Sequence, residues 1–290
     1  MIDLLPLKFW DNILFMKKLP LFISILLSII LTGSVIAQKS KDNTSAKPAS
    51  KAKPKTKYFG KKQVRFLNTE IPVVQEIQKL SKDGMHYDLP DAVADKNGRT
   101  WITHLIWDGK KDQLVLAQET ENGLQHLPDA FAKGILHQPA MAMDGKGTIW
   151  LFWGATQSDT TVDIKARSWN PGKNRGDLGK TTTLADSKAA EAFIDAGTDS
   201  KGRVWVTWQS FRAGEADVFT RFFDPKKNKW SEEIAVAVNK GGDWEPRIAF
   251  DKLGNAWIVY DSSRGNEFNL YITKVEENGK VTEFPVGRTS

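Results

Sequence analysis

The 290-residue chain contains no cysteine and only four histidines. Without cysteine, it has no disulfide framework, no thiol nucleophile and no thiolate ligand for a metal ion. The histidines do not follow HExxH or a comparable ligand spacing; they are His86, His104, His126 and His137. The sequence therefore predicts neither a metal site nor a cofactor. A chain of this length can bury enough apolar surface to fold without covalent cross-links.

Positive charge is concentrated at the start of the chain. Residues 1–57 hold 10 Lys plus Arg and 3 Asp plus Glu, a net charge of +7, whereas the whole chain carries +6. The other 233 residues therefore carry a net charge of −1. Because the basic balance belongs to this first segment, the rest of the chain gives no support for nucleic-acid recognition.

The first 37 residues have the order of a secretory signal peptide. Met16 and two lysines precede an apolar stretch, 21–37, which closes on small residues before Gln38. We expect cleavage and export to the periplasm, the cell surface or the medium, with Met16 as the natural start. A retained membrane anchor is the alternative, because about seventeen apolar residues are the lower limit for a span. Membrane contact is expected only through such an uncleaved anchor.

Residues 38–57 are rich in Lys, Pro, Ser and Ala and have almost no side chains to bury. This composition is typical of a disordered linker. Two roles remain open for its lysines: a solvated spacer, or contact with anionic lipid or polysaccharide. The folded domain is accordingly predicted over residues 58–290.

A short unit recurs along this domain at intervals of about fifty residues. It consists of an Asp, a Gly three residues later and a Trp three residues after that. The four copies are Asp95/Gly98/Trp101, Asp144/Gly147/Trp150, Asp199/Gly202/Trp205 and Asp251/Gly254/Trp257. Self-similarity at this period is typical of repeat architectures, and of β-propellers when each unit reads as several strands.

Each repeat splits into four short strands separated by turn residues. In the third repeat, the strand-like runs end near Asp199, cover 204–208 and 217–223, and finish with Trp230 and 234–238. Such runs are rich in β-branched and aromatic residues. We therefore predict an all-β fold, a β-propeller of about four to five four-stranded blades. Its repeats lie near 90–127, 139–185, 191–238 and 246–288.

The repeated residues have structural roles in this interpretation. Gly supplies a positive φ in a tight turn, Asp accepts hydrogen bonds from turn amides, and Trp packs between neighbouring blades. His104, Trp153, Trp208 and Tyr260 occupy one slot, three residues after the repeat Trp. These residues are predicted to build the scaffold.

The Asp/Gly/Trp turn resembles the Asp-box of the sialidase and BNR-repeat propellers. It resembles more closely the repeats of bacterial secreted propellers that read Pro-x-φ-Ala-x-Asp-x-x-Gly-x-x-Trp-φ-x-Trp. The resemblance covers residues 90–274 and implies a propeller fold. The turn departs from the sialidase motif because Gly follows Asp by three residues rather than two, and because no Ser stands two residues before Asp.

The ends of the predicted ring do not match. Residues 62–67 and 71–77 read as two further strands, equivalent to the outer pair of a blade, and 281–286 supply the outer strand of the last repeat. The inner pair that would complete the leading half-blade is missing. Either the sequence is part of a longer protein, or four blades close with a half-blade outside the ring.

A binding site is expected on the face of the propeller opposite the Asp/Gly turns, where the repeats differ. An exposed Trp beside acidic and basic side chains suits a sugar, because the ring packs on C–H groups while polar groups bond hydroxyls. The candidate ligand-binding residues are Trp244, Glu245, Asp243, Arg212, Arg264, Asp261 and Asp217. The alternative is that Arg212 and Arg264 pair with Asp217, Glu245 or Asp261 to hold loops in place.

Catalysis is the second open question. A glycosidase needs two carboxyl groups that face one bond, and the same face gathers Glu245, Asp243, Asp261 and Glu191. A sialidase-like site, which the resemblance would imply, needs three arginines and a Tyr nucleophile; Arg212, Arg264 and Arg247 with Tyr87 or Tyr260 are the candidates. We predict a non-catalytic module that binds a glycan or a protein partner. The alternatives are a glycoside hydrolase, sialidase-like or other, and a periplasmic scaffold that docks a protein.

Overall fold

The computed structural model describes residues 57–59, 62–64, 85–120, 123–127, 131–158, 161–172, 177–264 and 267–286. The chain divides into two units, Met1–Val73 and Val74–Ser290. In the first unit, β1 (Lys57–Phe59) and β2 (Lys62–Val64) pair as an antiparallel hairpin. The predicted signal peptide and the predicted strand over 71–77 lie outside the described residues. In the described parts, no helix is long and apolar enough to cross a membrane.

The described residues of the second unit form four antiparallel sheets, which we call blades 1 to 4. Blade 1 consists of β3 (His86–Ala94), β4 (Thr100–Trp107), β5 (Asp112–Thr120), β6 (Gly123–His126) and β7 (Ala132–Gly134). Blade 2 consists of β8 (Leu136–Met143), β9 (Ile149–Ser158), β10 (Thr161–Asn170), β11 (Asp177–Leu178) and β12 (Thr182–Ala185). Blade 3 consists of β13 (Glu191–Thr198), β14 (Val204–Ser210), β15 (Asp217–Asp224), β16 (Lys229–Trp230) and β17 (Ile234–Ala237). Blade 4 consists of β18 (Asp243–Phe250), β19 (Ala256–Arg264), β20 (Glu267–Val275) and β21 (Val281–Val286).

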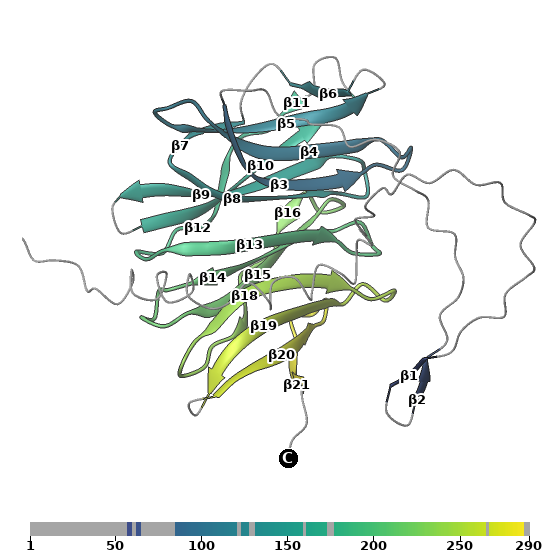
Figure 1. The fold of residues 1–290 in the computed structure, drawn as a ribbon, viewed down its shortest axis with the longest axis vertical. Helices are drawn as coiled ribbons and strands as arrows, with labels where there is room; N and C mark the ends of the chain where they lie inside the picture. Colours follow the sequence, from purple (N-terminus) through teal and green to yellow (C-terminus); the bar gives the residue numbers. More distant parts are fainter. Residues whose placement is uncertain are drawn as a thin grey trace, which may run out of the picture. The chain divides into compact units, whose positions relative to one another are not determined.

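All four blades share one topology, in which consecutive strands are neighbours. In blades 1 to 3 the outer strand is interrupted, and both of its segments pair with the third strand. The blades follow one another from β3 to β21, and the first strands β3, β8, β13 and β18 contact each other in that order (Figure 1). This arrangement confirms the predicted β-propeller fold.

Three hydrophobic clusters fill the three interfaces between consecutive blades. The repeat Trp of each leading blade is buried in them: Trp101 against blade 2, Trp150 against blade 3 and Trp205 against blade 4. Trp101, for example, packs edge-on against Trp169 with ring centroids 5.0 Å apart. The predicted packing role is confirmed for these three. The fourth, Trp257, is half-buried and stacks instead on Phe284 of its own blade.

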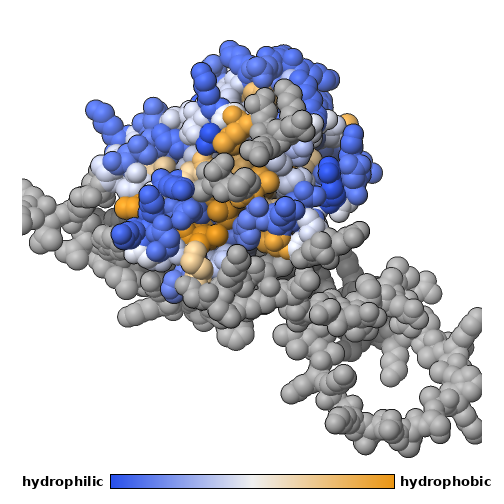
Figure 2. All heavy atoms as spheres, turned by 90° about the horizontal axis from the view of Figure 1, so that it is seen from above, coloured by the Kyte–Doolittle hydropathy of each residue, from blue (hydrophilic) through white to orange (hydrophobic). Residues whose placement is uncertain are grey.

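The apolar side chains of the unit are gathered on sheet faces, with polar residues along the rims. Seen from above, a band of apolar residues crosses the described surface between hydrophilic residues on both sides (Figure 2). This distribution follows from the two-residue period of a strand, which sends alternate side chains to opposite faces of its blade.

The Asp/Gly turns have the geometry that the repeat predicts. The Asp199 carboxylate accepts hydrogen bonds from the amides of Lys201 (2.9 Å) and Arg203 (3.0 Å) and from the Trp205 indole (2.9 Å). Gly202 has a φ of +77°, and a Cβ atom there would lie 2.7 Å from the Gly145 Cα of the preceding turn. Glycine is therefore required twice over, by the backbone angle and by the approach of two blades.

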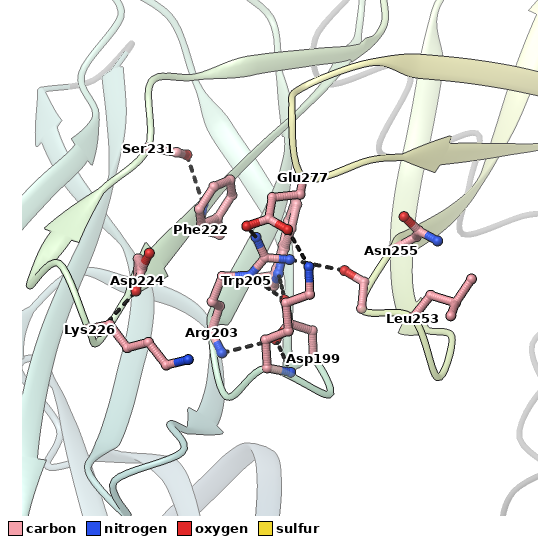
Figure 3. A network of polar contacts seen from close by, with 12 residues as sticks. Asp199, Arg203, Trp205, Phe222, Asp224, Lys226, Ser231, Leu253, Asn255 and Glu277 are labelled. Atoms are coloured by element: carbon pink, nitrogen blue, oxygen red, sulfur yellow. Dashed lines mark hydrogen bonds and ion pairs between the residues drawn. The ribbon is translucent and has the colours of Figure 1, made fainter.

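Arg203 connects blades 3 and 4 on the turn face (Figure 3). Its Nε lies 2.6 Å from Asp199, an Nη donates to the Gly254 carbonyl (3.0 Å), and Nη1 lies 3.3 Å from Glu277. Lys201 also bonds Glu277. Only 4% of the Arg203 side chain is exposed. A buried ion pair of this kind is costly to break, because the remaining charge stays desolvated.

We predict that Arg203→Met lowers the free energy of unfolding by ~3–5 kcal/mol, because the Arg203 guanidinium is itself buried and also joins blade 4 at the Gly254 carbonyl. Arg99→Met in blade 1 is the matched control: it removes the same turn ion pair, but 49% of the Arg99 side chain is exposed. The control is expected to change stability little. Urea denaturation of both variants measures the difference, and equal losses would contradict the role assigned to burial.

Candidate binding site on blade 4

The residues predicted to bind a ligand separate into two groups in the structure. Arg212, Arg264, Asp243 and Asp217 belong to polar contacts inside blades 3 and 4. Trp244 and Glu245 lie at the start of β18. Asp261 lies on β19, directly opposite Trp244. Asp217 and Asp243 are buried, whereas Trp244 and Glu245 are half-buried and Asp261 is exposed.

Blades 3 and 4 each contain one arginine with an equivalent set of contacts inside its own blade. The Arg212 guanidinium lies 4.1 Å from the centre of the Phe219 ring, 2.6 Å from Glu233 and 3.4 Å from the buried Glu191. The Arg264 guanidinium repeats these contacts, at 3.7 Å from the Tyr271 ring, 2.7 Å from Glu283 and 3.5 Å from the buried Asp243. These partners correct the expected pairing with Asp217, Glu245 or Asp261. Glu283 lies on β21 and Glu233 directly precedes β17, and both were missed because they are far from the arginines in sequence.

Burial explains the other polar residues of this region. Asp243 is fully buried and accepts a hydrogen bond from the Asn239 amide (3.0 Å). Burial, and then the charges of Asp243 and Glu215, raise the pKa of Asp217. Glu191 is fully buried and accepts a hydrogen bond from the Trp208 indole (2.8 Å). These carboxylates are held within the fold.

The tyrosines proposed for catalysis have packing partners as well. Tyr260 is 1% exposed and donates its phenol proton to Glu283. Burial, and then the Glu283 bond, raise the pKa of Tyr260 far above its usual range. The Tyr87 ring lies 5.4 Å from the His104 ring in blade 1. The environment of Tyr260 does not activate a phenolate nucleophile, which would need a lowered pKa.

The exposed group centres on an aromatic pair, Trp244 of β18 and Phe268 of β20. Their ring centroids lie 5.6 Å apart at an interplanar angle of 31°, and Phe268 is 76% exposed. Gly242 is required beneath the indole: its φ is +91°, and a Cβ atom there would lie 2.4 Å from the Trp244 ring. The sequence predicted Trp244 as a contact residue but missed Phe268.

Charged groups surround this pair. Burial raises the pKa of Glu245, while the charge of Arg247 lowers it and that of Asp261 raises it further. Partial burial also raises the pKa of Asp261. Arg247 is exposed and donates to the Pro246 carbonyl (3.1 Å). The site thus combines an apolar platform with two carboxyl groups and one guanidinium.

Glu245 has a φ of +50°, in the left-handed region that most side chains avoid. It lies in a bulge between Trp244 and Arg247, and its amide donates to Gln209 of blade 3 (3.0 Å). Equivalent bulges interrupt all four first strands, and Leu89 and Phe193 have similar φ values, +50° and +53°. The strained backbone is therefore a property of the blade and does not itself mark a site.

Among the residues that the structure describes, no group of three or more His, Cys, Asp or Glu side chains could hold a metal ion. The groups beside Trp244 can stack, form hydrogen bonds and, through their carboxyl groups, transfer protons.

No protein-family model and no curated protein matches the sequence. Solved structures with a similar fold include a Dyadobacter fermentans protein of unknown function, at 14% identity over 70% of this chain and 70% of that one, with a TM-score of 0.49. The Fusarium graminearum α-L-arabinofuranosidase Arb93A is 12% identical over 69% of this chain and 66% of that one, with a TM-score of 0.49. A Bacteroides thetaiotaomicron endo-arabinase is 9% identical over 70% of this chain and 81% of that one, with a TM-score of 0.45. Similarity at this level carries no conclusion about function.

We predict that Arg264→Met and Arg212→Met each lower the free energy of unfolding by ~3 kcal/mol, because Asp243 and Glu191 would stay buried without a cation. Arg247→Met, which removes an exposed arginine from the same face, is expected to leave stability within ~0.5 kcal/mol of the parent. Chemical denaturation measures all three. If the first two variants were as stable as the third, the guanidinium groups would be free for a ligand instead.

Proposed function

We propose that the chain is an exported, non-catalytic β-propeller module that binds a glycan at the Trp244–Phe268 pair. The observation that carries the proposal is this aromatic pair, in which Phe268 is exposed and Trp244 is half-buried, with Glu245, Asp261 and Arg247 beside it. A sugar ring has an apolar face of C–H groups and a rim of hydroxyls. An aromatic platform next to charged hydrogen-bonding groups matches both parts.

Export is proposed from the signal-peptide pattern of residues 1–37. The Asp-box-like turns support a place among the bacterial secreted propellers that carry such repeats. A sialidase-like site has weaker support. Two of its three candidate arginines, Arg212 and Arg264, already bind carboxylates within their own blades, and Tyr260 is buried.

The binding proposal predicts that an oligosaccharide raises the melting temperature of the purified chain, because a ligand that binds only the folded state stabilises it by ~2.7 kcal/mol at 100 times its Kd. Intrinsic fluorescence from the eleven tryptophans can follow the melt against a panel of oligosaccharides. Trp244→Ala should abolish the shift.

Leu253→Ala serves as the control, because Leu253 is 75% exposed on the turn side of blade 4. It should leave the shift unchanged. A shift that persisted in Trp244→Ala would place the site elsewhere, and a cooperative melt without any shift would favour a protein partner.

A glycoside hydrolase is the second candidate, and one observation favours it. Glu245 and Asp261 interact electrostatically, and burial raises both of their pKa values. A general acid requires a carboxyl group with a raised pKa, while a second carboxyl group acts as base or nucleophile. In this case Glu245→Gln should abolish turnover but keep binding.

If the chain hydrolyses a glycan, its kcat/KM should fall as the pH rises through the raised pKa of Glu245, because the general acid loses its proton there. The charge of Arg247 lowers that pKa. Arg247→Met should therefore move the alkaline limb of the pH profile to higher pH, while Lys274→Met, which neutralises a more distant cation of the same blade, should not. An unmoved limb would exclude Glu245 as the acid.

A further inference from the structure

The surface of blade 4 that points away from blade 3 differs from the equivalent surfaces of the other blades; we call it the end face. In blade 3 this surface is covered by blade 4, and Trp205, Val218 and Ala237 are at most 4% exposed. The matching positions in blade 4 are Trp257, Leu270 and Val286, because the strands of blade 4 pair in the same register as those of blade 3. Leu270 is 39% exposed and Val286 is 45% exposed.

At two other positions the end face differs from the interface of blade 3. Where blade 3 has Ala192 and Ala216, blade 4 has Trp244 and Phe268. Ala216 is 2% exposed, and its carbonyl accepts a hydrogen bond from the Asp243 amide (2.6 Å) of the next blade. A phenyl ring at this position would obstruct so close an approach of two backbones.

Charge distinguishes the same two surfaces. Blade 4 has Lys274 where blade 3 has Phe222 at the interface, and Asp261 where blade 3 has Gln209. Burying these charges under another sheet would cost far more than burying the residues of blade 3. The end face therefore fits an occupant with hydroxyl groups better than it fits an apolar sheet.

Aromatic rings stand at two places along the end face. The first pair is Trp244 and Phe268; the second is Trp257 and Phe284, with centroids 5.9 Å apart at 29°. Trp244 stands opposite Asp261, which follows Trp257 by four residues on β19. At ~3.3 Å per strand residue, the two pairs are ~13 Å apart. A single sugar ring cannot touch both pairs, whereas an extended chain can.

We propose that the end face binds an extended, neutral, linear polysaccharide that lies along β19 and β20 and stacks on both aromatic pairs. An acidic polymer is disfavoured because Arg247 faces Glu245 and Asp261, and Lys274 is paired with Glu276 (3.2 Å), so that the surface offers no excess of positive charge to a polyanion. The exposed Leu270 joins the two platforms. The inference rests on the proposed glycan binding and adds the length and charge of the ligand.

Calorimetry with oligosaccharides of two to six residues tests this inference. The probes are β-1,4-glucan, β-1,4-xylan and α-1,5-arabinan fragments, with oligogalacturonate as the acidic counterpart. For at least one neutral series, we expect the hexamer to bind about tenfold more tightly than the dimer, since one further stacking contact contributes about that much. Oligogalacturonate should bind no better than the neutral dimer.

Variants of the two platforms separate this inference from the proposed function. Phe284→Ser should bring the hexamer within twofold of the dimer and leave dimer binding intact, whereas Trp244→Ala should abolish both. Phe284→Tyr keeps the ring and should retain the length dependence, which excludes misfolding as the cause. If Trp244→Ala abolished binding but length had no effect, glycan binding would stand and the extended site would be wrong. If no probe bound, both would fail.

Sedimentation velocity tests the competing occupant, a second copy of the chain. We expect a monomer at micromolar concentration, with Leu270→Glu weakening the hexamer at least fivefold. A dimer that Leu270→Glu dissociates, while Leu253→Glu on the turn side does not, would overturn the proposal in favour of self-association.

Discussion

The structure depends on the stacking of one sheet face on the next. A four-stranded antiparallel blade with apolar residues on both faces cannot be stable alone in water, since each face exposes the side chains that drive folding. Blades 1 to 3 solve this by burying Trp101, Trp150 and Trp205 in clusters shared with the following blade. The Asp/Gly turns serve the same end, because each Asp holds the hairpin that presents its Trp.

Stacking also explains the irregular first strands. A bulge near the middle of β3, β8, β13 and β18 lets side chains reach across to the next blade. Asp91 accepts a hydrogen bond from the Met141 amide (2.7 Å), and Asp195 accepts one from the Ile248 amide (2.8 Å). Burial raises the pKa of both carboxyl groups, yet both are engaged in joining blades. A raised pKa near the centre of this fold is therefore not by itself a sign of catalysis.

The sequence predicted what is local and repeated. The spacing of Asp199, Gly202 and Trp205 defines a turn whose hydrogen bonds all lie within seven residues. Because this turn occurs four times, the sequence predicted a repeat architecture. It did not predict contacts that depend on strand register. Arg264 contacts Glu283 only because β19, β20 and β21 pair in one particular register, and that register cannot be predicted from the spacing of residues in the sequence. Phe268 was missed for the same reason: its neighbour Trp244 lies two strands away.

Comparison among the blades separates scaffold from site more sharply than any single residue does. Glu245 shares its strained backbone with Leu89 and Phe193, so strain carries no information about function there. Trp244 and Phe268 replace alanines, and Lys274 replaces a phenylalanine, at positions where blade 3 has to admit another sheet. Large exposed aromatic surface destabilises a soluble protein unless something covers it. Charged neighbours keep such a surface hydrated while it is empty, and hydroxyl groups of a sugar replace that water without leaving the charges unpaired. A surface with this composition is suited to a ligand that binds and dissociates. The permanently buried interface between two blades has no need of charged groups, because it never faces water.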